Sequence, residues 1–139
     1  MKKRKFSLIL MTCILMVSLL AGCSGGKLSD KFDEATVKSE AERLITCFFN
    51  EDYKGIIDAF PEELQSQTTE EDWKTVKDTY ASQQGAFKSF SKEVLSSQHD
   101  DATDTDIAFI IVIAECENAD IQFTLSFNEE MELTNFFLK

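Results

Sequence analysis

The chain has 139 residues, of which 43% are hydrophobic, and its formal charge is −11. This length suits one domain with a single core. Beyond the first five residues no basic cluster is present to neutralise phosphates, so the composition argues against a nucleic-acid partner.

The chain opens with four basic residues at positions 2–5, followed by a mostly apolar run over 6–20. This run is too short for a transmembrane helix, because a bilayer core about 30 Å thick needs about 20 apolar residues. A basic start and a short apolar run are typical of a secretory signal peptide, which places the following chain outside the cytoplasm.

The run ends in Leu20-Ala21-Gly22-Cys23, which resembles the lipobox of bacterial lipoproteins. The resemblance implies that the Cys23 thiol receives a diacylglyceryl group and that cleavage leaves Cys23 first. Two acyl chains suffice for stable anchoring. The alternative is an uncleaved signal anchor. We therefore expect a signal peptide over 1–22, a lipidated tether and helix start over 23–37, and a domain over 38–139, anchored at the extracytoplasmic face of a bacterial membrane.

Removal of residues 1–22 changes the formal charge to −15, because four basic residues and no acidic residue are lost. Cys47 and Cys116 are then the cysteines left besides Cys23. Disulfides persist outside the cytoplasm, but two free buried thiols are also ordinary, so both states remain open. Neither cysteine has the spacing of a metal site.

Helical periodicity covers the next part of the chain. An apolar stripe predicts a first helix, whose buried residues are Val37, Ala41, Leu44, Ile45 and Phe48. A second, short helix is predicted from Tyr53 to Phe60, because Pro61 ends it. Thr68 and Glu71 match a capping box and predict a third helix over about 69–84, with Gly85 as its stop. Trp73, Val76 and Tyr80 lie at helical spacing along it, and its partly polar character indicates a lid or a flanking element rather than a central one.

After Gly85 the apolar period changes toward two. Strands are predicted over 87–97, 105–117, 120–128 and 132–139. In the first, Phe90 and Val94 are predicted to share a face. The second contains an uncharged run over 107–114, typical of a central strand with both faces covered. Helices followed by a four-stranded antiparallel meander predict an α+β fold with the first helix packed on the sheet.

Three stretches carry a family resemblance: FFNEDYKGIIDAF, GAFKSF and VIAECENADIQFTLSFNEEMELTNFFL. Through them, residues 38–139 resemble the domain-of-unknown-function 3887 family, and the order of elements resembles the nuclear-transport-factor-2-like fold. That resemblance implies a curved sheet forming a cone around an apolar pocket. The family carries no accepted activity, so it implies no functional residue.

Candidate catalytic groups are few. His99, the only histidine, lies in an acidic loop beside Asp100 and Asp101, either as a surface residue or as a weak metal contact. Adjacent carboxylates occur in predicted turns and helix starts, where acidic residues are favoured for local reasons. We therefore predict no catalytic residue, no metal site and no cofactor.

The twelve phenylalanines indicate a large core and, in part, a pocket. Those that could line a pocket for an apolar ligand are Phe48, Phe87, Phe109, Phe123 and Phe137. We expect a non-enzymatic binding module for a small apolar ligand or a protein partner. The alternative is a structural or interaction protein that forms a homodimer through its sheet face.

Overall fold

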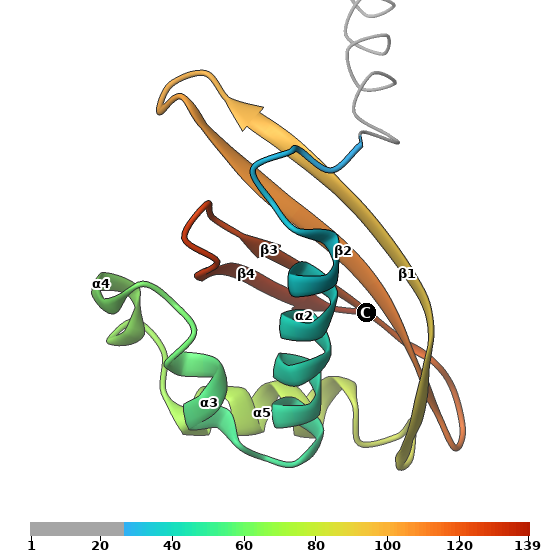
Figure 1. Ribbon diagram of the computed structural model, residues 1–139. Coiled ribbons are helices and arrows are strands. Elements are labelled where there is room, and N and C mark those ends of the chain that lie inside the picture. Colours follow the sequence, from blue (N-terminus) through green and yellow to red (C-terminus); the bar gives the residue numbers. More distant parts are fainter. Residues whose placement is uncertain (1–26) are drawn as a thin grey trace, which may run out of the picture.

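The computed structural model describes residues 27–139 (Figure 1). In this part of the chain the helices are α2 (Glu34–Phe49), α3 (Tyr53–Ile57), α4 (Glu62–Gln65) and α5 (Glu70–Tyr80). The strands that follow are β1 (Phe87–Asp100), β2 (Thr105–Cys116), β3 (Ile121–Phe127) and β4 (Leu133–Leu138). They form an antiparallel sheet in the order β1-β2-β3-β4. The predicted order of helices followed by a four-stranded antiparallel sheet is confirmed.

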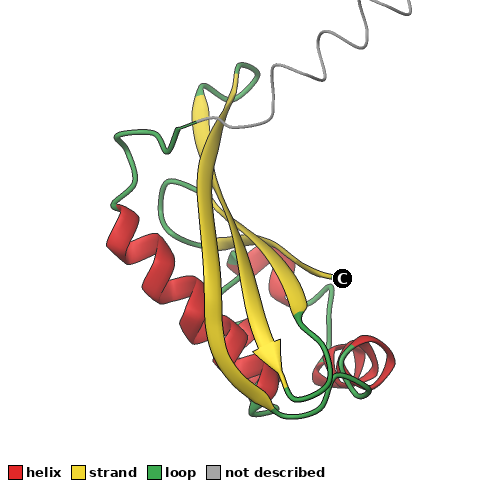
Figure 2. Cartoon of the chain, turned by 90° about the vertical axis from the view of Figure 1, so that its right-hand side faces the viewer, coloured by secondary structure: helices red, strands yellow, loops and turns green. Residues whose placement is uncertain are grey.

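Helix α2 supplies the apolar face that the sheet needs. It begins after Asp33, whose carboxylate accepts a hydrogen bond from the Thr36 amide at 2.9 Å. The predicted stripe is completely buried: Val37, Ala41, Leu44, Ile45 and Phe48. Figure 2 shows α2 lying along one side of the strongly twisted sheet.

The segment after α2 is divided more finely than predicted. The helix at Tyr53 ends at Ile57, and α4 begins as a separate short helix directly after Pro61. Proline fits a helix start because its missing N–H is not needed there, and the acidic residues Glu62 and Glu63 favour the first turn. Pro61 therefore starts α4, and it does not end α3, because that helix stops four residues earlier; the prediction that the helix reaches Phe60 is wrong.

Helix α5 is shifted and shortened relative to the prediction. Thr69 and Asp72, one residue further along than predicted, cap each other's backbone N–H groups. The helix ends at Tyr80 rather than near residue 84. Gly85 instead shapes the turn into β1: its φ is 81°, and an added Cβ would lie 2.8 Å from the Cβ of Glu117.

Strand β1 contains two register shifts, and these change which side chains face the helices. One shift falls between Phe90 and Lys92. An extra residue reverses the alternation of a strand, so Glu93 faces the core beside Val112 while Val94 faces outward. Phe90 and Val94 therefore lie on opposite faces, which corrects the prediction that they share one.

Strand β2 is central in the sheet, but its two faces differ. Its core face is completely buried and carries Ala108, Ile110, Val112 and Ala114. Its outer face is only partly buried and carries Ile107, Phe109, Ile111 and Ile113. The prediction that both faces of this strand are covered therefore holds, within residues 27–139, for its core face only.

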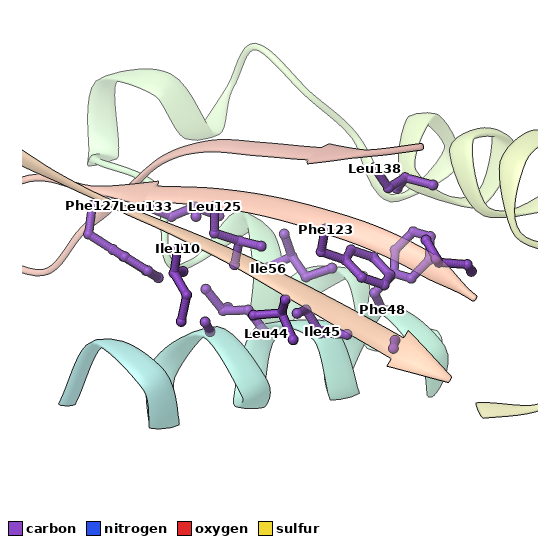
Figure 3. Close-up of a cluster of buried hydrophobic side chains, with 14 of the residues drawn as sticks. Leu44, Ile45, Phe48, Ile56, Ile110, Phe123, Leu125, Phe127, Leu133 and Leu138 are labelled. Atoms are coloured by element: carbon purple, nitrogen blue, oxygen red, sulfur yellow. The ribbon is translucent and has the colours of Figure 1, made fainter. Parts of the chain in front are cut away.

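The core lies between α2 and the sheet (Figure 3). Phe48 of α2 and Phe123 of β3 are both completely buried and meet edge to face, with ring centroids 5.6 Å apart. Burial of each such side chain contributes about 1.5–3 kcal/mol. Side chains thus fill the space between α2 and the sheet, where the family resemblance implied an apolar pocket.

Candidate binding site

An open groove of about 480 Å³ lies between α5 and the edge strand β4. Its walls are largely apolar, with Trp73, Val76 and Tyr80 from α5 and Phe136, Phe137 and Leu138 from β4. Among the described residues, the exposed large hydrophobic side chains are Tyr80 (59%), Phe137 (55%) and Val94 (45%). Two of these three line the groove, and apolar side chains gathered around a hollow mark a binding surface.

Helix α5 lies beside β4 without closing onto it. It packs mainly against α3, and the Lys77 ammonium donates a hydrogen bond of 3.0 Å to the Phe49 carbonyl at the end of α2. The predicted spacing of Trp73, Val76 and Tyr80 puts these side chains on one helix face, which lines the groove. The helix is thus fastened to its helical neighbours, and the side toward β4 stays open.

Aromatic rings form the floor of the groove. The Trp73 and Phe136 rings meet edge to face, with centroids 5.1 Å apart. Phe136 also contacts Phe48 and Phe123, each at a centroid distance of 5.8 Å. Such pairs add about 0.5–1.5 kcal/mol beyond area burial. The floor is therefore continuous with the core and held in place by it.

Strand β4 borders the groove with backbone groups that do not pair with β3. Gln122 and Lys139 exchange two backbone hydrogen bonds, each 3.0 Å long. Hydrogen-bonded pairs alternate along an antiparallel ladder. The peptide groups of Phe136 and Leu138 therefore point away from β3, toward the free edge of the sheet.

A second hollow of about 280 Å³ continues the groove toward the start of β4. It shares Thr68, Trp73 and Phe136 with the first hollow. Its remaining walls include Phe60 and Leu64 before α5, together with the first part of β4. The two hollows together follow β4 along its length.

Two buried polar atoms on α3 and α5 have no hydrogen-bond partner among residues 27–139. They are the Tyr53 hydroxyl and the indole Nε1 of Trp73, which lines both hollows. Burial raises the pKa of the Tyr53 hydroxyl, which keeps it protonated. A buried polar group without a partner costs about 1–3 kcal/mol. Trp73, in the helical wall of the groove, therefore carries a buried N–H donor without a partner among the described residues.

The five phenylalanines predicted to line one pocket do not come together. Phe48 and Phe123 belong to the filled core, and Phe87 is partly buried at its margin. Phe109 lies on the outer face of β2, because alternate residues of a strand face opposite sides. Of the five, Phe137 alone lines the groove. The groove depends instead on Trp73 and its helical neighbours, which the sequence indicated only as a flanking stripe.

Cys47 and Cys116 are free thiols in the structure, so the disulfide left open by the sequence is not formed. Burial raises the pKa of both thiols. At Cys47 the nearby Asp52 carboxylate, 3.6 Å from Sγ, adds to this effect on the pKa. Both changes disfavour the reactive thiolate.

His99 lies near the end of strand β1, opposite Asp106 of β2, and therefore not in a loop as predicted. It does not line the groove. Its Nδ1 is 2.6 Å from Asp106, and its Nε2 is 3.5 Å from both Asp101 and Asp104. The hydrogen bond with Asp106 raises the pKa of the imidazole. Asp106 also accepts a hydrogen bond from the Ser29 hydroxyl, so the cluster ties the start of the described chain to the hairpin. Among residues 27–139, no group of side chains suits a metal ion.

The fold also pairs two carboxyl groups that sequence reasoning missed. Glu93, turned inward by the β1 register shift, has a side chain only 19% exposed and lies beside Glu42 of α2. Burial first, and then Glu42, raise the pKa of Glu93, whereas the Lys38 ammonium at 3.9 Å opposes the change. These two carboxyl groups lie at the margin of the core. Nothing in the sequence distinguishes Glu93 from an ordinary exposed residue of a strand.

The lipobox, including Cys23, lies outside the described residues. In the part of the chain that the structure describes, no helix is both long and apolar enough to cross a bilayer. Lipidation of Cys23 therefore stays a prediction.

Comparison with known proteins gives a family and a structural neighbour. Residues 41–136 match the family described as "Protein of unknown function (DUF3887)". The chain is also similar to a solved structure described as an NMR structure of a protein from Ruminococcus gnavus ATCC 29149. The two are 28% identical with a TM-score of 0.71, over 80% of this chain and 95% of that chain. No curated protein matches the chain.

Proposed function

Because this chain belongs to the DUF3887 family, whose description names no function, we propose a function from the geometry of its groove. The protein is a lipid-anchored, non-enzymatic binding module at the bacterial cell surface, and the groove between α5 and β4 is its binding site. The family match confirms the resemblance drawn from the sequence. The nuclear-transport-factor-2-like fold stays part of the proposal, favoured by the order of helices and strands, but without the implied inner pocket, because side chains fill that space.

The observation that supports binding is the position of the exposed hydrophobic side chains. Tyr80 and Phe137 face solvent across a groove of about 480 Å³ whose floor is Trp73 and Phe136. Pockets for small ligands commonly have volumes of about 300–1,000 Å³ and mostly apolar walls. The groove therefore suits an apolar ligand, or the apolar side chains of a protein partner.

A neutral apolar dye, Nile red, tests the groove directly. We expect the dye to fluoresce when bound to the purified protein, and we expect Tyr80→Ser and Phe137→Ser to weaken this binding severalfold. Val94→Ser is the matched control, because Val94 is also exposed but lies outside the groove. Loss of binding in the control but not in the groove variants would contradict the proposal.

The anchor has a separate test. A bacterium expressing the full chain is grown with a labelled fatty acid, and the label is expected on the protein. Cys23→Ala should abolish the label, whereas Cys13→Ala, inside the predicted signal peptide, should retain it. A label that persists in Cys23→Ala would contradict lipidation at this position.

A second candidate function is a homodimer formed through the outer sheet face. A stripe of Ile107, Phe109, Ile111 and Ile113 is partly exposed there, next to the exposed Val94. The stripe itself carries no charge, so two copies can join there without bringing carboxylates together. Light scattering should then show a dimer that Ile111→Glu dissociates, whereas a strict monomer at high concentration would exclude this candidate.

A further inference from the structure

We infer that the ligand of the groove is an extended peptide segment of another protein, which pairs with the free edge of β4 as an added strand. The segment is basic and has apolar side chains at alternate positions. This inference rests on the proposed function, because it uses the same groove and names the class of ligand. Strand addition is a common way for sheet edges to bind peptides.

The free edge of β4 is open where the groove lies. At the start of the strand, the Leu133 N–H donates a hydrogen bond of 2.8 Å to the Ala59 carbonyl, which closes that end. Further along, the peptide groups of Phe136 and Leu138 point away from β3, and both residues line the groove. A peptide lying in the groove can therefore pair its backbone with these two residues.

The shape of the groove suits a strand better than a compact ligand. Two hollows, about 480 and 280 Å³, adjoin at Trp73 and Phe136 and follow β4. In an added strand, side chains at alternate positions lie about 6.6–6.8 Å apart on one face. One such side chain can enter the hollow at Val76 and the next can enter the hollow at Leu64, whereas a compact ligand fills one hollow.

The two edge strands of the sheet differ in their protection against added strands. Strand β1 has two register shifts and the exposed lysines Lys88 and Lys92, features that discourage edge pairing. Strand β4 pairs regularly with β3 from Asn135 to Leu138 and has no charged residue over 133–138. The less protected edge is thus the one beside the apolar groove, as expected for an edge that takes a partner.

The acidic character of the domain indicates which charge the bound peptide segment should carry. Residues 27–139 contain all 25 acidic residues of the chain but lack the four basic residues at positions 2–5. The charged residues that line the groove are Asp72 and Lys139, and two further acidic residues, Glu70 and Glu71, precede Asp72 in the first turn of α5. The excess of acidic residues over the described domain, rather than the lining itself, gives this surface its negative charge. Charge complementarity across an interface therefore favours lysine or arginine in the bound segment.

The test uses a synthetic peptide of about seven residues, the length of an ordinary strand, with valine at alternate positions, threonine between them and lysine at both ends. The matched control peptide is N-methylated at alternate amides, which blocks strand pairing on one edge and keeps the side chains. Binding is followed by the fluorescence of Trp73, the only tryptophan, and by NMR hydrogen exchange of the Phe136 and Leu138 amides.

We expect the unmodified peptide to bind, to slow exchange of the Phe136 and Leu138 amides, and to lose affinity about tenfold in Tyr80→Ser, as at other interface aromatic residues. The N-methylated peptide should not bind. Val94→Ser should bind the peptide like the parent protein, because Val94 lies outside the groove.

The remaining outcomes separate this inference from the proposed function. Equal binding of both peptides overturns strand pairing, as does peptide binding without slower amide exchange. Nile red binding without peptide binding also overturns the inference and leaves the apolar groove as the binding site. If neither the dye nor the peptide binds, both the inference and the proposed function are overturned.

Discussion

The core and the groove are built from the same kinds of side chain, and Phe136 contacts both, yet one is closed and the other is open. In the core, Phe48 and Phe123 are completely buried. In the groove, Tyr80 and Phe137 are more than half exposed. The difference follows from the helices: α2 packs directly on the sheet, whereas α5 packs mainly on α3 and stands beside β4. The packing partner of a helix therefore decides whether its apolar stripe stabilises the fold or remains available to a ligand.

The largest effect should come from the closed side of this comparison. Phe48→Ala removes a completely buried ring with aromatic neighbours on α2, β3 and β4. The free energy of unfolding should fall by about 3–5 kcal/mol. Urea unfolding followed by circular dichroism measures this change. A loss below about 1 kcal/mol would mean that the core is not closed as described.

A smaller effect is expected at the charged margin of the core. The pKa of Glu93 is raised, so the native state holds its proton to higher pH than the unfolded state. The free energy of unfolding therefore falls as pH rises from about 4.3, the ordinary glutamate pKa, through the raised value. Glu93→Gln should remove this loss and raise stability at pH 7 by up to about 1 kcal/mol.

Urea unfolding of the parent and Glu93→Gln proteins at several pH values measures this prediction. Glu130→Gln is the matched control, because Glu130 is exposed in the β3–β4 turn. If the stability difference between the parent and Glu93→Gln does not change with pH, then Glu93 titrates alike in the folded and unfolded states.

The exposed side chains of the groove should contribute little to the free energy of unfolding. Tyr80→Ser and Phe137→Ser alter side chains that are already exposed, so each should change the free energy of unfolding by no more than about 0.5 kcal/mol. The same urea experiment as for Phe48→Ala gives a direct comparison. A loss of several kcal/mol in either groove variant would show that the groove is part of the core.

The smallest effect should occur at the β1–β2 hairpin, remote from both regions. The pKa of His99 is raised by Asp106, so its ion pair is complete below about pH 6.5 and is lost as pH rises through the raised pKa. NMR titration of the ring should show this raised pKa, and Asp106→Asn should lower it. Dye binding in the groove should be the same before and after this titration, and a parallel change would show that the hairpin and the groove are coupled.

The periodic elements could be predicted from the sequence because their signals are local. The stripe of α2 and the alternation of β3 each repeat over several turns or residues, and both are present in the structure. The helical face of the groove was also visible in the spacing of Trp73, Val76 and Tyr80. What faces this stripe depends on how α5 packs, and local spacing does not contain that information.

Other features depend on single residues that break a pattern. The register shift near Phe90 turns Glu93 inward, and no residue type marks it in the sequence. Pro61 was interpreted only as a stop, although the acidic residues after it are typical of a helix start. The pocket of five phenylalanines failed for a different reason, since it combined side chains from both faces of the sheet.

Helix α2 has a further consequence for the orientation of the molecule. The described chain begins at Lys27, whose carbonyl is bound by Ser97 of β1, whereas α3 and α5 lie at the opposite end of α2 (Figure 1). With 16 residues, α2 spans about 24 Å at about 1.5 Å per residue. If Cys23 carries the lipid, α2 acts as a spacer between the anchored end and the α5 end of the molecule. The groove, lined by α5, would then lie near the end of the domain away from the tether.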